Sequence, residues 1–393
     1  MADDRFHAFT AHAPLTMPAG GRRDGPLSGR TLAVKDLYDV AGMKTGFGMP
    51  EKLAEAPVAA TTTLAIARLV DAGAEIVGKT ICDEMCFSLM GNNNFYPRAI
   101  NPRAPERFTG GSSAGSAAAV AGGLADIATG SDTGGSVRAP AAFCGLVGLR
   151  TTHGLVPLDH TVPLAPSLDT FGWFAADIDL YATVGDILLP TAGNRFARCF
   201  RLPDVEKLTA VNSAESYAVM AAKVAEGFGP AKPAELKTLD TDERYECFRA
   251  IQAYEAWAMH GDWVTRPGRR ISPAVADRFL YGRSVSTDDY AAAWKSRRDF
   301  TAEIESLLGD DGLLVIPTVP SAAPFADADA DTEQAYRARA LRMLCLSGLS
   351  GLPQITIPLG DDEGAPFAIS LVGPRFSDRA LIDAARVLMR AER

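Results

Sequence analysis

The sequence lacks the features of a membrane protein or of a nucleic-acid-binding protein. No apolar run approaches the roughly 20 residues that a membrane-spanning helix needs, and the acidic N-terminus MADDRFHAFT has no apolar signal segment. Basic residues are in deficit, because 39 Lys and Arg face 48 Asp and Glu for a formal net charge of −9. Without a basic cluster, the chain has nothing that would attract a phosphate backbone or an anionic membrane. We therefore expect a cytoplasmic protein that acts on a small molecule, and no nucleic acid and no membrane as partners.

Clusters of cysteine and of other metal ligands are also scarce. The six cysteines are scattered, mostly in apolar or helical contexts, which favours reduced thiols over a disulfide framework. Cys82 and Cys86 are four residues apart, but no neighbouring His or Cys completes a zinc site. The acidic segment 326–332 resembles the start of a calcium loop, yet Thr332 and Ala338 stand where an EF-hand needs Gly and Glu. We expect neither a metal ion nor a cofactor.

Apolar strand-like segments alternate with helical periods along the chain. After Thr31, the segment TLAVKDLYDV is followed by the amphipathic TTTLAIARLVDAG and then by AEIVGKT, the order of a strand–helix–strand unit. Further strand-like segments lie at 312–320, 351–360 and 368–376. The pattern predicts an α/β fold with a single large mixed, mostly parallel sheet that is covered by helices on both faces.

The chain length alone would suggest two or three domains. Segment 195–310 is rich in charged and aromatic residues at helical spacing, unlike the flanking strand-like parts. We therefore predict a single domain over 1–393, with a core formed by 20–190 and 312–393. The helical segment of about 195–310 is predicted to be an insertion that shapes the substrate pocket.

The centre of the first half is rich in glycine and poor in charge. Residues 101–155 contain eleven of the 36 glycines, and Asp126 is the one charged residue between Thr109 and Ser131. Within this stretch, SAGSAAAVAGGLA predicts a helix of small residues. Small side chains let neighbouring backbones approach closely, so we expect this helix at the centre of the fold.

Two short motifs match known signatures outside their required structural context. The string GAEIVGKT at 73–80 reads as a P-loop, but a P-loop is a turn between strand and helix, and AEIV is itself strand-like. The string GSSAG at 111–115 fits the G-x-S-x-G elbow around Ser113, but an elbow follows a strand and the polar NPRAPERFT precedes this one. None of the histidines that such a triad would need has a distinguishing local signal: His153, His160 and His260.

The strongest candidate site combines a lysine with two glycine–serine segments. Lys35 ends an apolar run and is one of only four lysines in the first 190 residues. Burial at a strand end disfavours the charged ammonium and makes a neutral amine available as a base. The segments TGGSSAGSAAA at 109–119 and TGSDTGGSVRAP at 129–140 bracket the helix of small residues. Two such segments around one buried helix are hard to explain as ordinary turns.

These segments resemble the amidase signature family of serine hydrolases. The resemblance covers the chain from about Gly29 to Pro190 and again at 312–376, and Gly110 to Pro140 aligns with the family pattern without gaps. It implies the amidase signature fold and the hydrolysis of an amide. The chain is short for the family, and the residue near Gly348 is an asparagine in many members.

The resemblance also implies a catalytic triad without histidine. Lys35 occupies the position of the family's lysine, Ser112 that of a serine whose preceding peptide bond is cis, and Ser136 that of the nucleophile. Serine needs a base within hydrogen-bond reach to attack a carbonyl. Neutral Lys35 would take a proton from Ser112 while Ser112 takes one from Ser136. Acylation of Ser136 would release ammonia or an amine, and water would then hydrolyse the acyl-enzyme.

The tetrahedral intermediate of this reaction needs N–H donors aimed at its oxyanion. Two successive glycines allow a loop to turn its N–H groups inward. The natural oxyanion-hole donors are therefore Thr133, Gly134, Gly135 and Ser136. We expect an ion pair between Asp132 and Arg138 to hold this loop, and Ser113 to support Ser112.

The substrate and assembly follow from weaker similarities. The segments GKTICDEMCFS, SLDTFGWFAAD and SGLPQITIPLG are most similar to the branch that contains indoleacetamide hydrolases. This similarity suggests a small arylacetamide such as indole-3-acetamide as substrate, and a homodimer as assembly. The alternatives are the A subunit of a glutamine-dependent tRNA amidotransferase or heteromeric amidase, which needs partner chains, and a P-loop-like nucleotide-binding module.

Overall fold

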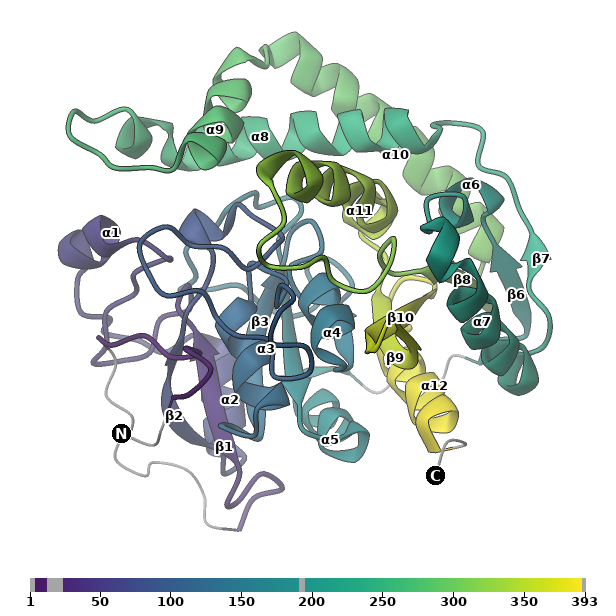
Figure 1. Ribbon diagram of the computed structural model, residues 1–393, viewed down its shortest axis with the longest axis horizontal. Helices are drawn as coiled ribbons and strands as arrows, with labels where there is room; N and C mark the ends of the chain where they lie inside the picture. Colours follow the sequence, from purple (N-terminus) through teal and green to yellow (C-terminus); the bar gives the residue numbers. More distant parts are fainter. Residues whose placement is uncertain (1–3, 13–23, 191–194, 391–393) are drawn as a thin grey trace.

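The first half of the chain builds a four-stranded sheet around a buried central strand. The computed structural model describes residues 4–12, 24–190 and 195–390 (Figure 1). The strand order is β2–β1–β3–β5, and β1 pairs in parallel with both β2 and β3, whereas β5 is antiparallel to β3. The strands are β1 (Thr31–Lys35), β2 (Glu75–Thr80), β3 (Ile127–Asp132) and β5 (Thr170–Ala175). The predicted strand–helix–strand unit is confirmed, with α2 (Leu64–Asp71) between β1 and β2.

The second sheet has six strands and draws mainly on the second half of the chain. Its order is β4–β9–β10–β8–β6–β7. The strands are β4 (Gly148–Arg150), β6 (Arg198–Arg201), β7 (Lys232–Pro233), β8 (Gly312–Pro317), β9 (Gln354–Asp362) and β10 (Ala365–Val372). The three strand-like segments predicted after residue 310 are thus confirmed as β8, β9 and β10.

The mixed α/β class is confirmed, while the expectation of one mostly parallel sheet is corrected in two respects. First, β9 and β10 are joined by Glu363 and Gly364, both at positive φ, and such a two-residue turn produces antiparallel pairing. Second, side chains interrupt the ladder where β4 adjoins β5. The Leu149 N–H donates to the Tyr181 hydroxyl at 2.7 Å, and the Thr151 hydroxyl donates to the Phe171 carbonyl at 3.0 Å. These bonds replace backbone bonds that would join the two sheets.

The predicted helix of small residues is confirmed as α3 (Ala114–Ala121), and seven of its residues are buried. Its close packing depends on the absence of side chains. A Cβ at Gly115 would lie 2.3 Å from the Ala8 carbonyl oxygen and 2.7 Å from the Ile81 nitrogen. Next to α3 lies α4 (Arg138–Cys144), whose residues are all buried. Both helices therefore belong to the core, as the low charge of this stretch indicated.

A layer of long helices covers one side of the core (Figure 1). The helix α11 packs against α8 and α10, and α9 packs against α8. These helices are α8 (Thr241–Val264), α9 (Pro273–Ser284), α10 (Thr287–Leu308) and α11 (Ala330–Ser350). The segment expected as a helical insertion, 195–310, also contributes β6 and β7 to the second sheet.

Shorter or peripheral helices complete the structure. They are α1 (Pro50–Glu55), α5 (Ile178–Leu188), α6 (Pro203–Glu206), α7 (Ala214–Phe228) and α12 (Asp378–Arg390), with 3₁₀ turns at Glu84–Cys86 and Val211–Ser213. All six cysteines are free and buried. Across the described ranges, no helix combines the length and the apolarity that a membrane crossing requires.

Candidate active site

A buried lysine surrounded by serine hydroxyls lies at the end of the central strand. Lys35 is fully buried, and its Nζ lies 2.9 Å from Ser112 Oγ, 2.9 Å from Ser113 Oγ and 2.8 Å from Ser131 Oγ. Its backbone N–H donates to Thr129 Oγ1 at 2.9 Å. The structure thus brings Lys35 and Ser112, which are 77 residues apart, into direct hydrogen-bond contact.

The topology explains this meeting. Because β1 and β3 run parallel, their carboxyl ends lie at the same edge of the sheet, which places Ser131 beside Lys35. Ser112 and Ser113 lie directly before α3, which packs on β1 and β3. The peptide bond between Gly111 and Ser112 is cis, and the Ser112 carbonyl accepts a hydrogen bond from the Asp83 N–H at 3.1 Å.

Ser113 contacts the lysine instead of supporting Ser112 directly. Its Oγ accepts from Lys35 Nζ and from the Ser131 N–H, the latter at 3.3 Å. Ser131 was missed by the sequence reasoning. Side chains two residues apart on a strand point to the same face, so Thr129 and Ser131 share one face of β3. Both contact Lys35, and this period of two could have indicated Ser131 from the sequence.

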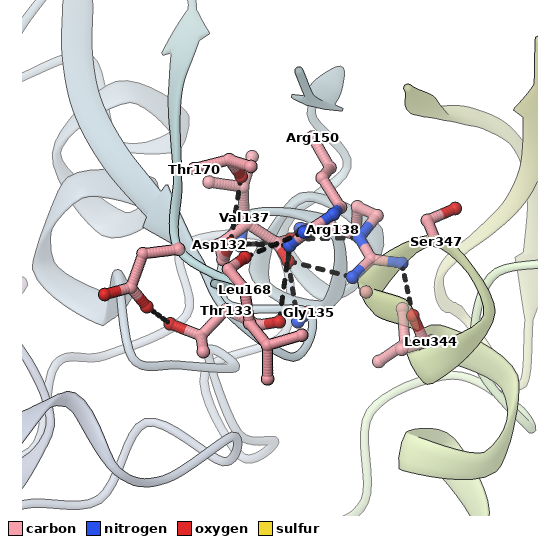
Figure 2. A network of polar contacts seen from close by, with 12 residues as sticks. Asp132, Thr133, Gly135, Val137, Arg138, Arg150, Leu168, Thr170, Leu344 and Ser347 are labelled. Carbon is pink, nitrogen blue, oxygen red and sulfur yellow. Dashed lines mark hydrogen bonds and ion pairs between the residues drawn. The ribbon is translucent and has the colours of Figure 1, made fainter. Parts of the chain in front are cut away.

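The loop after β3 is organised by one buried carboxylate (Figure 2). Asp132 accepts hydrogen bonds from the Gly135 N–H at 2.9 Å and from the Val137 N–H at 3.2 Å. It pairs with Arg138 at 2.8 Å and with Arg150 at 3.1 Å. Burial alone would raise the pKa of Asp132, but Arg138 and then Arg150 outweigh it and hold the pKa well below its usual range. The expected ion pair between Asp132 and Arg138 is therefore present, and Arg150 was missed.

Both arginines also donate to main-chain carbonyls around the loop (Figure 2). Arg138 Nη1 donates to the Leu344 carbonyl at 2.8 Å. Arg150 donates to the carbonyls of Asp132 at 2.6 Å and Leu168 at 2.7 Å. The loop is consequently fixed by Arg150 at the end of β4 on one side and by α11 on the other.

The geometry narrows the set of oxyanion-hole donors. The expected set included Gly135, but its N–H already donates to the Asp132 carboxylate inside the loop. Gly135 is therefore removed from the set of oxyanion-hole donors. Among the residues that the structure describes, the N–H groups of Thr133, Gly134 and Ser136 have no hydrogen-bond partner. Gly135 has φ +122°, and a Cβ there would lie 2.5 Å from Leu344 Cδ1, so glycine is required for the turn itself.

Ser136 is buried on the same loop and faces a pocket. Among the described residues its hydroxyl makes no hydrogen bond, to Ser112 or to another group. Ser136, Thr133 and Gly134 line a narrow pocket of about 10 Å³, the size of about one water-sized group. This pocket shares wall residues with a cavity of about 560 Å³ beneath the helical layer: Phe87, Gln252, Arg337 and Leu341.

Two buried carboxyl groups adjoin the site. Asp169 accepts from Thr133 Oγ1 at 2.6 Å, and burial raises the pKa of Asp169 to about 6. Asp83 accepts from the Gly91 N–H at 3.1 Å, while its Oδ1 lacks a partner within the described part of the chain. Burial raises the pKa of Asp83 to about 7, against the opposing effect of Lys35. Neither residue stood out in the sequence.

The misleading motifs lie in unsuitable elements. The P-loop string falls on β2, where its backbone groups pair with β1, and Lys79 forms an ion pair with Asp36 at 2.8 Å. Ser113 follows a loop and begins α3, so no strand leads into an elbow. In the acidic segment, α11 already begins at Ala330, and Asp329 caps it by accepting from the Thr332 N–H.

A helix-covered α/β core with a buried lysine among serines, next to a loop of free N–H groups, has the construction of a hydrolase that uses serine. The comparisons identify the family. The family model described as Amidase matches residues 8–194 and 209–382. The chain belongs to the amidase signature family, and it is an enzyme that hydrolyses amides.

Relatives named as amidases and as amidotransferase A subunits match over nearly the whole chain. Amidase 1 of Oryza sativa subsp. japonica is 36% identical, over 94% of this chain and 92% of its own length. The A subunit of the glutamyl-tRNA(Gln) amidotransferase of Halobacterium salinarum is 33% identical, over 93% of this chain and 96% of its own. A solved amidase crystal structure superposes with a TM-score of 0.82 at 27% identity, over 94% of this chain and 85% of its own. The predicted family is confirmed, whereas a specific branch for indoleacetamide is not shown.

Proposed function

We propose that this amidase cleaves small carboxylic amides to the acid and ammonia through an acyl-enzyme on Ser136. The observation that carries the proposal is the contact of buried Lys35 with Ser112 at 2.9 Å. A buried amine that contacts hydroxyls, with no carboxylate of the described residues in ion-pair contact, is suited to accept a proton. Ser112 then relays a proton from Ser136 to Lys35 as Ser136 attacks the amide carbon.

As Ser136 attacks, negative charge develops on the carbonyl oxygen of the substrate. The N–H groups of Thr133, Gly134 and Ser136 donate hydrogen bonds to this oxygen. Donors that are fixed before the reaction need no reorganisation, and one such donor is typically worth about two to three orders of magnitude in rate. Asp132 and its arginines hold the loop in this orientation. Ser112 returns the proton to the leaving nitrogen, and water then hydrolyses the ester on Ser136. The hydroxyl of Ser136 has no competing partner in the described structure, so it is free to turn toward Ser112 when substrate binds.

The substrate belongs to the small amides that fit a narrow pocket opening into a wider cavity. The amide group enters the pocket at Ser136, and the rest of the molecule occupies the cavity of about 560 Å³. Aromatic side chains line that cavity: Phe87, Tyr245, Phe248 and Tyr281. An arylacetamide such as indole-3-acetamide is therefore one candidate for the substrate panel.

A second candidate function is that of an amidotransferase A subunit. The 33% identity to the A subunit of the Halobacterium salinarum enzyme favours it. Such a chain would need partner chains, whereas the proposed amidase acts alone. Steady ammonia release from simple amides by the purified chain supports the amidase, and release only after partner chains are added supports the amidotransferase.

The nucleophile is tested by labelling and substitution. A fluorophosphonate probe should modify Ser136, as mapped by peptide mass spectrometry. Ser136→Ala should lose labelling and lower the rate of ammonia release by more than about a thousandfold while keeping the thermal melting temperature. Ser306→Ala, at an exposed position of α10, is the matched control and should keep both. Retained turnover in Ser136→Ala would exclude Ser136 as nucleophile.

The proposed base is tested by substitution. Lys35→Met removes the proton acceptor of the relay, so kcat/KM should fall by more than about a hundredfold. The measurement is initial ammonia release at about pH 7.5 with an uncharged amide such as indole-3-acetamide. A rate close to that of wild type in this variant would contradict the role of Lys35.

A further inference from the structure

Arginines gather on the wall of the cavity that leads to Ser136. The cavity of about 560 Å³ is lined by Arg249 of α8, Arg278 of α9 and Arg337 of α11. Asp277 is the carboxylate on the same wall. Arg337 also lines the narrow pocket at Ser136, so it stands on the wall that the two spaces share.

Arg337 is buried without a carboxylate partner. The residue is 8% exposed, Tyr245 is its side-chain hydrogen-bond partner, and its Nε has no partner within the described residues. No carboxylate of the described chain lies within ion-pair distance of it. Burial lowers the pKa of Arg337 from its usual value, and Tyr245 and Glu333 only partly oppose this effect. A buried charge in this state is costly unless something pairs with it.

Arg278 adds a second positive charge beside the first. It donates to the Phe87 carbonyl, and no described carboxylate forms an ion pair with it. Burial, followed by the charge of Arg337, lowers the pKa of Arg278 to about 9. Asp83 and Glu333 act on it from a distance. The two guanidinium groups thus create a positive field in a partly enclosed space, where electrostatic interactions are strong.

Arg249 provides an internal contrast in the same cavity. It pairs with Glu246 at 3.1 Å, and its guanidinium stacks 3.8 Å from the centre of the Tyr281 ring. Arg249 is therefore satisfied by the protein itself, whereas Arg278 and Arg337 are not. Arg278 and Arg337 are therefore available to an anion that is not part of the folded chain.

We propose that the substrate is an amide that also carries a carboxylate, which binds Arg337 and Arg278 while the amide group reaches Ser136. This inference rests on the proposed function, because it needs the amide carbonyl at Ser136. Arginine binds carboxylates through two parallel hydrogen bonds, a geometry that lysine does not offer. The apolar wall between the two ends, with Phe87, Phe248 and Leu341, suits a short hydrocarbon or aryl spacer. Neutral amides such as indole-3-acetamide would leave both arginines without a partner.

The test compares two amides of matched size. Pentanamide is neutral, and the monoamide of glutaric acid has the same chain length with a terminal carboxylate. The wild-type enzyme should show a kcat/KM at least about tenfold higher for the glutaric monoamide, the scale of one hydrogen-bonded charge. A higher kcat/KM for pentanamide would overturn the inference.

Substitution of the arginine assigns the effect to a residue. Arg337→Gln should reduce kcat/KM for the glutaric monoamide at least about tenfold more than it reduces that for pentanamide, mainly through KM. Arg337→Lys keeps the positive charge but lacks the planar guanidinium that forms two parallel hydrogen bonds. Its kcat/KM for the glutaric monoamide should lie between those of Arg337→Gln and wild type. Arg298→Gln, an exposed arginine of α10 that faces another part of the surface, should leave the ratio unchanged. Equal losses for both amides in Arg337→Gln would show a structural role and contradict the inference.

A binding measurement separates this inference from the proposed function. Glutarate should raise the melting temperature of the Ser136→Ala variant, and it should not raise that of the Ser136→Ala, Arg337→Gln double variant. Binding of glutarate without any amide turnover in wild type would retain the anion site and refute the proposed function. Turnover of neutral amides without a response to glutarate would retain the function and refute the anion site.

Discussion

Two pairs of arginines lie near the candidate nucleophile, and they differ in what surrounds them. Arg138 and Arg150 share the carboxylate of Asp132 and donate to the carbonyls of Leu344 and Leu168. Arg278 and Arg337 have no ion-pair partner in the described structure, whereas an unbonded Nε occurs in both pairs, at Arg150 and at Arg337. The first pair holds the loop that aims the N–H groups. The second pair faces the cavity.

The difference shows how the same residue type serves rigidity in one place and recognition in another. A charge that is paired with a carboxylate and with several carbonyls of the protein fixes geometry, because moving it would break several bonds at once. A charge left without a partner gains free energy when a complementary ligand arrives. Stability measurements can therefore distinguish the two pairs even before a substrate is known.

The largest effect is expected where the satisfied pair loses its carboxylate. Asp132→Asn leaves Arg138 and Arg150 buried without a counter-charge, so the free energy of unfolding should fall by about 3 to 5 kcal/mol. Urea denaturation at about pH 7.5 measures the change. Asp242→Asn breaks the exposed ion pair with Arg342 and should cost less than about 1 kcal/mol. Equal costs for the two variants would mean that the network around Asp132 is not what fixes the loop.

An intermediate effect is expected at Asp83, whose carboxyl lies near both Lys35 and Arg278. Its pKa is raised to about 7 in the folded protein, so the folded state binds more protons than the unfolded state between about pH 4 and 7. Its contribution to stability is therefore present at low pH and is lost as the pH rises through this window. From pH 5 to pH 7 the loss should be about 2 kcal/mol.

Asp83→Asn removes this titration, so its free energy of unfolding relative to wild type should increase by that amount over the same interval. Urea denaturation of both proteins at pH 5, 6 and 7 measures the trend. Asp242→Asn, whose carboxyl is exposed, provides the reference. A difference between Asp83→Asn and wild type that does not vary with pH would show that Asp83 is ionised throughout.

The smallest effect on stability is expected at the unsatisfied pair. Arg337→Met replaces a buried charge that lacks an ion-pair partner by an apolar side chain, so the free energy of unfolding should stay within about 1 kcal/mol of wild type or increase. Arg150→Met, which leaves Asp132 short of a partner, should instead lose several kcal/mol, about 3 or more. If both substitutions destabilise equally, Arg337 is a structural residue and the distinction between the pairs fails.

The parts of the site that depend on local motifs could be predicted from the sequence. Lys35 at a strand end and the two glycine–serine segments carry their own signals, and the parallel order of β1 and β3 brings them together. Arg150 and Gln354 could not be found in this way, because each reaches Asp132 or Arg138 only through the folded chain. Arg278 and Arg337 lie on helices where an arginine usually faces water, and only the packing of the helices places both on the cavity wall and buries Arg337.

The fold likewise has parts that local sequence patterns predict and parts that depend on contacts made only in the folded chain. Apolar segments and their order predict the strands β1, β2, β8, β9 and β10 and the helix α3, since those patterns are local. The break between the two sheets depends on Tyr181 and Thr151, whose hydroxyls reach across to backbone groups, and no periodicity contains that information. Likewise, only the folded structure explains the glycine near the position where many family members have an asparagine, because a Cβ at Gly348 would lie 3.0 Å from the Phe248 ring.

The helix α11 connects the two arginine pairs. Arg337 near its middle lines the cavity, and one or two turns further along, Leu344 provides the carbonyl for Arg138 and the side chain that packs on Gly135. A displacement of this helix would consequently alter substrate choice and the donor loop together. For enzyme engineering, the backbone of α11 is best left in place. New selectivity is best sought by exchanging the side chains of α9 that line the cavity, because Phe248 and Gln252 of α8 also approach the donor loop at Gly134.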